Sequence, residues 1–181
     1  MTLAHLPAHL RLIGPARGPA EAACRETRTR AERLFGSFER DPLCQVATRQ
    51  ALFEHLERVG ALAPSSPLSM VVVKVNGLVA LNRDRGWRVG DELLQEIAGR
   101  IRSFTRATDL VGRLTGSSFG LILQGTGATA AGAVASRLEF QLHRPSIVPP
   151  PTGVLVSVAT GTGINAEMLP MAALDSLGEC C

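Results

Sequence analysis

The chain has 181 residues, of which 45% are hydrophobic and 19% charged, and its formal net charge is +3. This balance is typical of a folded globular protein and excludes a disordered or low-complexity chain. A net charge of +3 is too small to indicate a nucleic-acid partner, and we expect none.

The sequence has no pattern typical of a membrane span or of a signal peptide. No run approaches the roughly 18 consecutive apolar residues of a membrane span, and the first residues lack the apolar core of a signal peptide. The four cysteines (Cys24, Cys44, Cys180 and Cys181) do not have the spacing of a zinc site. We therefore predict a cytoplasmic protein with reduced thiols and no membrane insertion.

Residues 1–40 are predicted to form an N-terminal lead followed by a charged helix. Prolines and glycines interrupt the first 20 residues, whereas Glu21–Phe38 has apolar residues at helical spacing. The arginines and glutamates of this segment alternate, which is typical of a solvated helix face. On length, the rest of the chain is expected to form one domain.

The first elements of that domain are a helix and a strand. Asp41 and Pro42 predict a helix start, with the aspartate as cap and the proline in the first turn. The helix is expected to continue through Arg49–Val59. The β-branched run Leu68–Val75 then predicts a buried strand, with Lys74 close to its end.

A helical stretch, a loop and a longer helix are expected next. Leu78–Asn82 has helical character, and Arg83–Gly90 is predicted to be a polar loop. Asp91 is expected to cap an amphipathic helix whose apolar residues recur as far as Phe104.

The second half predicts a hairpin, a helix and a last strand. Leu110–Leu114 and Phe119–Leu123 flank a turn at Thr115–Ser118, and a helix is expected to run through Leu142. Val154–Ala159 is the last predicted strand. Helices that alternate with strands, together with one hairpin, predict an α/β fold built on a mixed sheet.

Two short motifs in this region carry chemistry. Arg106 and Asp109, three residues apart, combine a guanidinium fork with a carboxylate, which can hold a phosphate together with a guanine edge. The alternative is a surface ion pair that contributes at most about 1 kcal/mol. The tip of the hairpin carries small hydroxyl groups and no carboxylate.

Four motifs in this order resemble those of the GGDEF (diguanylate cyclase) domain family. They are Asp41-Pro42-Leu43 with Arg49 and Phe53; Lys74-Val75-Asn76 to Asn82 with Gly86, Gly90-Asp91 and Leu94; Arg106-x-x-Asp109; and Thr115-Gly116-Ser117-Ser118-Phe119. Five residues separate the last two motifs, as in the family's RxxD inhibitory site and GGDEF signature. The resemblance covers Asp41 to about Thr160 and assigns residues 41–178 to this domain.

The resemblance implies a central mixed sheet with cyclase-type topology, helices on both faces and the signature on a β-hairpin. It also implies the activity of working members, which join two GTP molecules into cyclic di-GMP with Mg²⁺ held by carboxylates. Here the carboxylate positions hold Lys74, Ser117 and Ser118. The family's phosphate-binding lysine is replaced by Val79, and we expect the family's closing C-terminal helix, with its Ala-Leu-Tyr-x-Ala-Lys pattern, to be missing. We expect no catalytic residues, no metal and no cofactor.

The ligand-binding residues of the inhibitory site are better preserved. Arg106 and Asp109 match that site, and Arg137 falls where family members carry a further arginine. Asn82 and Asp91 match positions that contact guanine, although both are also ordinary helix-capping residues.

The leading hypothesis is a catalytically inactive GGDEF domain that binds cyclic di-GMP through Arg106, Asp109 and Arg137. It would signal through a protein partner or a homodimer. The alternative is a nucleotide-independent structural or dimerisation module. A third hypothesis is an active diguanylate cyclase.

Overall fold

The structure, a computed structural model, describes residues 38–144 and 153–177. The predicted helix Glu21–Phe38, and with it most of the predicted N-terminal segment 1–40, lies outside the described residues. Within the described ranges, no helix combines the length and the apolar character that a membrane crossing needs.

A four-stranded sheet forms the centre of the domain, in the order β2-β3-β1-β4 with antiparallel neighbours. The strands are β1 (Pro67–Val75), β2 (Leu110–Arg113), β3 (Ser118–Gln124) and β4 (Val154–Thr162). The helices are α2 (Arg49–Leu62), α3 (Leu78–Arg85), α4 (Trp87–Phe104), α5 (Ala128–Leu142), the 3₁₀ helix η1 (Gly163–Met168) and α6 (Leu169–Asp175).

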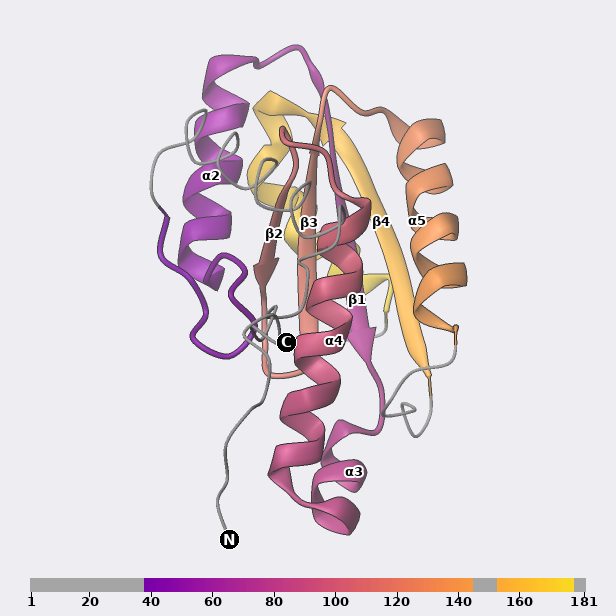
Figure 1. The fold of residues 1–181 in the computed structure, drawn as a ribbon. Helices are drawn as coiled ribbons and strands as arrows, with labels where there is room; N and C mark the ends of the chain where they lie inside the picture. Colours follow the sequence, from indigo (N-terminus) through magenta and orange to yellow (C-terminus); the bar gives the residue numbers. More distant parts are fainter. Residues whose placement is uncertain (1–37, 145–152, 178–181) are drawn as a thin grey trace, which may run out of the picture.

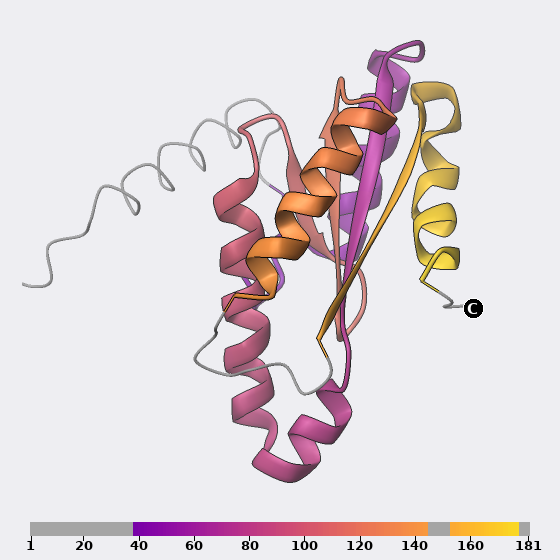
Figure 2. The same ribbon diagram turned by 90° about the vertical axis from the view of Figure 1, so that its right-hand side faces the viewer.

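Helices cover both faces of the sheet because side chains of β1 point alternately to each face. Val71, Val73 and Val75 pack in one cluster with α4 and α5. Met70 and Val72 pack in the other cluster with α2 and α6. Figure 2 shows the sheet between α4 and α5 on one side and α6 on the other. The predicted α/β architecture with helices on both faces is therefore confirmed.

The sheet is antiparallel between all of these strands. The mixed character that we expected is limited, in the described part of the chain, to one isolated parallel bridge between Ala47 and Gly112. The hairpin β2–β3 and the strands β1 and β4 form where the sequence predicts them. A helix, α6, follows β4 where we expected no closing helix, although its sequence lacks the Ala-Leu-Tyr-x-Ala-Lys pattern.

The predicted helix start at Asp41 is wrong. Residues 41–48 form a turn, and α2 begins at Arg49 with the Thr48 side chain accepting a hydrogen bond from the Ala51 N–H. Asp41 uses its carboxylate differently, since Oδ1 accepts from the Cys44 N–H at 2.7 Å. An aspartate followed by proline suits either a helix cap or a turn, and tertiary contacts select the turn.

The predicted loop Arg83–Gly90 is also wrong. The helix α3 continues to Arg85, and α4 already begins at Trp87. Gly86 separates the two helices with a φ of 86°, a conformation that glycine adopts without steric cost. Asp91 therefore lies inside α4 and does not cap it. The two helices extend past the end of β1 (Figure 1).

A glycine in β3 lets α2 approach the sheet closely. A Cβ atom on Gly120 would lie 2.6 Å from Met70 Cε and 2.7 Å from Leu52 Cδ2. We expect Gly120→Ala to destabilise the fold by about 1–3 kcal/mol because the added methyl overpacks the core. Thermal and urea unfolding measure this change.

The matched control is Gly99→Ala in α4, where an added Cβ meets no heavy atom within 4 Å. This substitution should stabilise the protein by up to about 1 kcal/mol through helix propensity. Equal effects of the two substitutions would contradict the close approach of α2 to β3.

Candidate functional site

The hairpin turn Thr115–Ser118 is held by the arginine that precedes it. The Arg113 guanidinium donates from Nη2 to the Gly116 carbonyl at 2.9 Å and from Nε to the Thr115 carbonyl at 3.3 Å. Its Nη1 donates to both carboxylate oxygens of Asp41, each at 3.2 Å. The turn is thereby fixed to the segment before α2.

This network is largely shielded from solvent. The Arg113 and Asp41 side chains are 18% and 16% exposed. Beside them, burial raises the pKa of the Cys44 thiol to about 11, although the nearby Arg113 charge acts in the opposite direction. Cys44 is therefore a neutral, unreactive core residue at neutral pH.

Side chains at the signature positions meet at the end of β1. Lys74 lies directly opposite Ser118 in the antiparallel register, so both side chains project from the same face of the sheet. The Ser118 hydroxyl is buried and has no hydrogen-bond partner within the described residues. Thr115 and Gly116 are exposed at the tip, whereas Phe119 is buried in the core.

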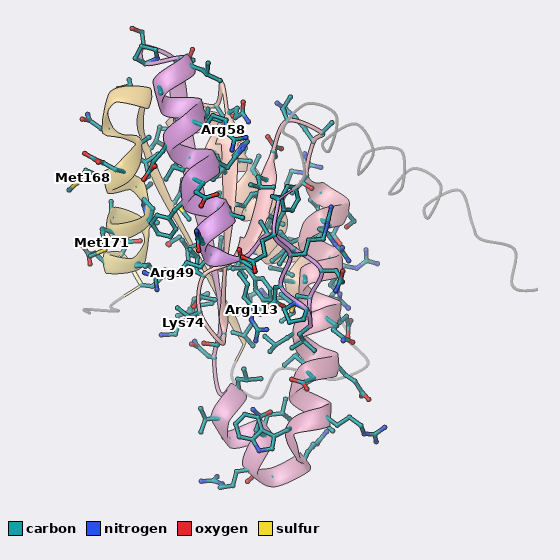
Figure 3. The ribbon with its side chains drawn as sticks, turned by 90° about the vertical axis from the view of Figure 1, so that its left-hand side faces the viewer. Arg49, Arg58, Lys74, Arg113, Met168 and Met171 are labelled. Atoms are coloured by element: carbon teal, nitrogen blue, oxygen red, sulfur yellow. The ribbon has the colours of Figure 1, made fainter. Side chains whose placement is uncertain are left out.

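Three basic side chains lie in this region, of which Arg113 is paired with Asp41. Figure 3 shows Lys74, Arg49 and Arg113 near the first turns of α2. Within the described residues, no three His, Cys, Asp or Glu side chains are grouped closely enough to hold a metal ion. An ammonium group and two hydroxyls at the signature positions are a donor set that does not fit Mg²⁺, which prefers carboxylate oxygens.

The predicted guanine contacts lie on the α3–α4 pair. Asn82 Oδ1 is buried without a hydrogen-bond partner in the described region. It packs against Gly90, where any Cβ would collide with it. Asp91 follows Gly90 on α4 and is partly buried. The structure thus places the Asn82 side chain against Gly90, the neighbour of Asp91. Its amide oxygen faces the backbone of α4.

The predicted ligand motif forms a closed turn after α4, which we call the RxxD turn (Arg106–Asp109). The Asp109 N–H donates to the Arg106 carbonyl at 3.1 Å, and Asp109 Oδ2 accepts from the Arg106 N–H at 2.9 Å. Asp109 is only 8% exposed. Burial raises the pKa of its carboxyl group, while the Arg106 N–H, the Arg106 charge and the Thr108 side chain act to lower it.

Arg137 reaches the same end of α4 from the neighbouring helix. Its guanidinium carbon lies 5.9 Å from the ring centroid of Phe104, the last residue of α4. Arg106 and Arg137 are both exposed. The structure thus joins Arg106 to Asp109 directly, and no ion pair joins either residue to Arg137 in the described part of the chain.

Sequence spacing does not indicate two residues that support this turn, Gln124 directly and His55 through Gln124. The Gln124 side-chain amide donates to the Thr108 carbonyl at 2.8 Å and lies 3.0 Å from His55 Nε2. His55 is buried on α2, and burial, together with the Arg58 charge, lowers its pKa to about 4. No local pattern reveals this contact, because α2, β2 and β3 meet only in the folded chain.

A cavity of about 210 Å³ adjoins His55. It is lined by α2 residues, by Leu110 at the start of β2 and by the segment before α2: Phe38, Glu39, Gln50, Ala51, Glu54, His55, Arg58 and Leu110. The cavity therefore lies between α2, the start of β2 and the segment before α2.

The Arg113 network predicts a stability effect. Arg113→Met leaves the carboxylate of Asp41 shielded from solvent without its ionic partner, which should destabilise the fold by about 3 kcal/mol. Urea unfolding measures this loss. The control Arg83→Met removes an ion pair whose side chains are 77% and 62% exposed, and should change stability by less than about 1 kcal/mol. Similar losses in both variants would contradict the role assigned to Arg113.

Comparison with known proteins assigns most of the chain to a family. The family described as "Diguanylate cyclase, GGDEF domain" matches residues 38–167. Diguanylate cyclase A of Treponema denticola is 31% identical over 129 residues, which cover 71% of this chain and 34% of that relative. The uncharacterized protein y4lL of Sinorhizobium fredii is 30% identical over 139 residues, covering 76% of this chain and 16% of that relative. The chain therefore spans only 34% and 16% of the length of these two relatives.

Solved structures share the fold. The diguanylate cyclase SiaD, in complex with its activator SiaC from Pseudomonas aeruginosa, is 24% identical with a TM-score of 0.67, covering 88% of this chain and 65% of SiaD. The GGDEF domain of DgcB from Caulobacter crescentus, in complex with c-di-GMP, is 21% identical with a TM-score of 0.61, covering 77% of this chain and 86% of that domain.

Proposed function

Since the chain belongs to the GGDEF family, we propose that it is a catalytically inactive member that binds cyclic di-GMP at the RxxD turn. The observation that supports this proposal most directly is the closed turn itself. In this turn Asp109 is buried and accepts a hydrogen bond from the Arg106 backbone N–H. This turn holds its shape while the signature positions at the end of β1 lack carboxylates.

The loss of activity follows from charge. An ammonium about 4 Å from a divalent cation costs roughly 4 kcal/mol per unit of opposed charge at an effective dielectric near 20. Lys74 therefore disfavours the metal that the family's chemistry requires, and Ser117 and Ser118 supply no compensating negative charge. Val79, at the phosphate-binding position, is 83% exposed and has no charge to offer a triphosphate.

The RxxD turn offers groups that suit a guanine nucleotide. The exposed Arg106 fork can bind a phosphate in bidentate fashion, and Asp109 Oδ1 can accept from a guanine N–H while Oδ2 holds the turn. Arg137, beside the Phe104 ring, adds a second guanidinium that can stack on a base. A guanine N–H bonded to Asp109 would favour its charged form and offset the effect of burial.

Relatives support both the ligand and a protein partner. The DgcB domain is in complex with c-di-GMP, and SiaD is in complex with an activator protein. A cytoplasmic receptor that passes the signal to a protein partner, or to a second copy of itself, agrees with both. Asn82 and Asp91 stay a prediction as residual guanine contacts.

A nucleotide-independent interaction module is the second candidate. The observation that favours it is the exposure of apolar side chains on η1, α6 and the end of α2. Met168, Met171 and Leu62 are 61%, 44% and 80% exposed, and Figure 3 shows both methionines on the outer side of the domain.

Isothermal titration with cyclic di-GMP tests the proposal. The wild-type protein should bind with a micromolar or lower Kd, about −8 kcal/mol or better. Arg106→Ala should weaken binding by roughly 10–100-fold, because it removes charge-assisted hydrogen bonds to the ligand. Asp109→Asn should also weaken binding while keeping the fold, since an amide oxygen still accepts from the Arg106 N–H.

Arg83→Ala is the matched control, since Arg83 is an exposed arginine on α3, away from the RxxD turn. It should bind like the wild type. Unchanged affinity in Arg106→Ala, or production of cyclic di-GMP from GTP and Mg²⁺ by the wild type, would refute the proposal.

A further inference from the structure

We infer that Gln124 and His55 are positioning residues that hold the RxxD turn in its ligand-binding shape without touching the ligand. This inference deepens the proposed function and rests on it for the identity of the ligand. The contacts themselves are independent of that function.

The Gln124 side chain ties the RxxD turn to the end of the sheet. The β2–β3 ladder stops at the pair Leu110 and Ile122. Two residues further, Thr108 would pair with Gln124 if the ladder continued. The Gln124 side chain replaces that missing backbone bond, since its amide donates to the Thr108 carbonyl at 2.8 Å. The peptide between Thr108 and Asp109 is thereby tied to β3.

The hydrogen bonds of Gln124 fix the protonation of His55. The carbonyl of Thr108 can only accept, so the Gln124 atom beside it must be the NH₂ group. The same nitrogen lies 3.0 Å from His55 Nε2, which must therefore accept. His55 is consequently neutral, with its proton on Nδ1. The lowered pKa of His55 agrees with this state at neutral pH.

The residues behind Gln124 form a rigid support. His55 is 3% exposed on α2, and it faces Gln124 at the end of β3. Charged groups around the adjoining cavity are Glu54 and Arg58 from α2 and Glu39 from the preceding segment. The RxxD turn is thus fixed twice, by its own Asp109 carboxylate and by Gln124 from the core. Such fixation lowers the ordering cost of binding.

Two substitutions of Gln124 test the inference. Gln124→Met keeps the length of the side chain and removes both hydrogen bonds. Gln124→Glu keeps the shape, but its carboxylate repels the Thr108 carbonyl and attracts a protonated His55. Both variants should bind cyclic di-GMP roughly tenfold more weakly. Both should also raise the pKa of His55, as measured by nuclear magnetic resonance, because each removes the donor to Nε2, and Gln124→Glu should raise it further through its negative charge.

The control is Gln95→Met, because Gln95 is an exposed glutamine whose amide donates to the Leu43 carbonyl at 3.3 Å, away from the RxxD turn. It should leave the affinity and the pKa of His55 unchanged.

A measurement without ligand separates this inference from the proposed function. Amide hydrogen exchange at Asp109, whose N–H closes the RxxD turn, should become faster in Gln124→Met than in the wild type and in Gln95→Met. If the wild type does not bind cyclic di-GMP, the proposed function fails, and this exchange rate still decides whether Gln124 holds the turn. Unchanged exchange at Asp109, or a His55 ring protonated on Nε2 in the neutral state, overturns the inference.

Discussion

The ion pair between Arg113 and Asp41 is the interaction on which the geometry of the β2–β3 hairpin and its signature turn depends. It links the turn before α2 to the hairpin, and the same guanidinium holds the Thr115 and Gly116 carbonyls. A buried pair of this kind contributes little net stability by itself, but the loss of one partner is costly. The geometry of the hairpin is therefore maintained by residues outside its tip. The tip is consequently free to change its side chains without a change in the fold.

In the proposed function, the tip has lost its catalytic chemistry in this way. Lys74 and Ser118 face each other across β1 and β3, at positions where the family's catalytic chemistry needs carboxylates. The RxxD turn lies at the other end of β2 and depends on different supports, namely Asp109 and Gln124. Because the two ends share no hydrogen bond among the described contacts, one can lose its chemistry while the other keeps its shape.

Much of the fold was predictable from the sequence, because hydrophobic periodicity reports burial directly. The β-branched run of β1 and the hairpin strands have this signal. The failures occurred where local signals had two meanings. Asp41 could cap a helix or close a turn, and Arg113, far away in sequence, decides between them. Gly86 permitted two helices to meet where polar residues suggested a loop.

The candidate site was predictable only in part, for a similar reason. Spacing placed Arg106, Asp109 and Arg137 in one family pattern, and the structure gathers them at one end of α4. Spacing could not show that Asp109 is buried, because burial is a property of the assembled layers. Nor could it reveal His55 and Gln124, which come from elements that meet only after folding.

Mapping the cyclic di-GMP contacts by nuclear magnetic resonance on isotope-labelled protein tests the central claim most directly. The account predicts that ligand-induced shifts are largest at Phe104–Asp109 and around Arg137 on α5. The chemical shifts of Lys74 in β1 and Ser118 in β3, which pair at the other end of the sheet, should not change. Shifts centred on Lys74 and Ser118, or the absence of any shift at millimolar ligand, would contradict it.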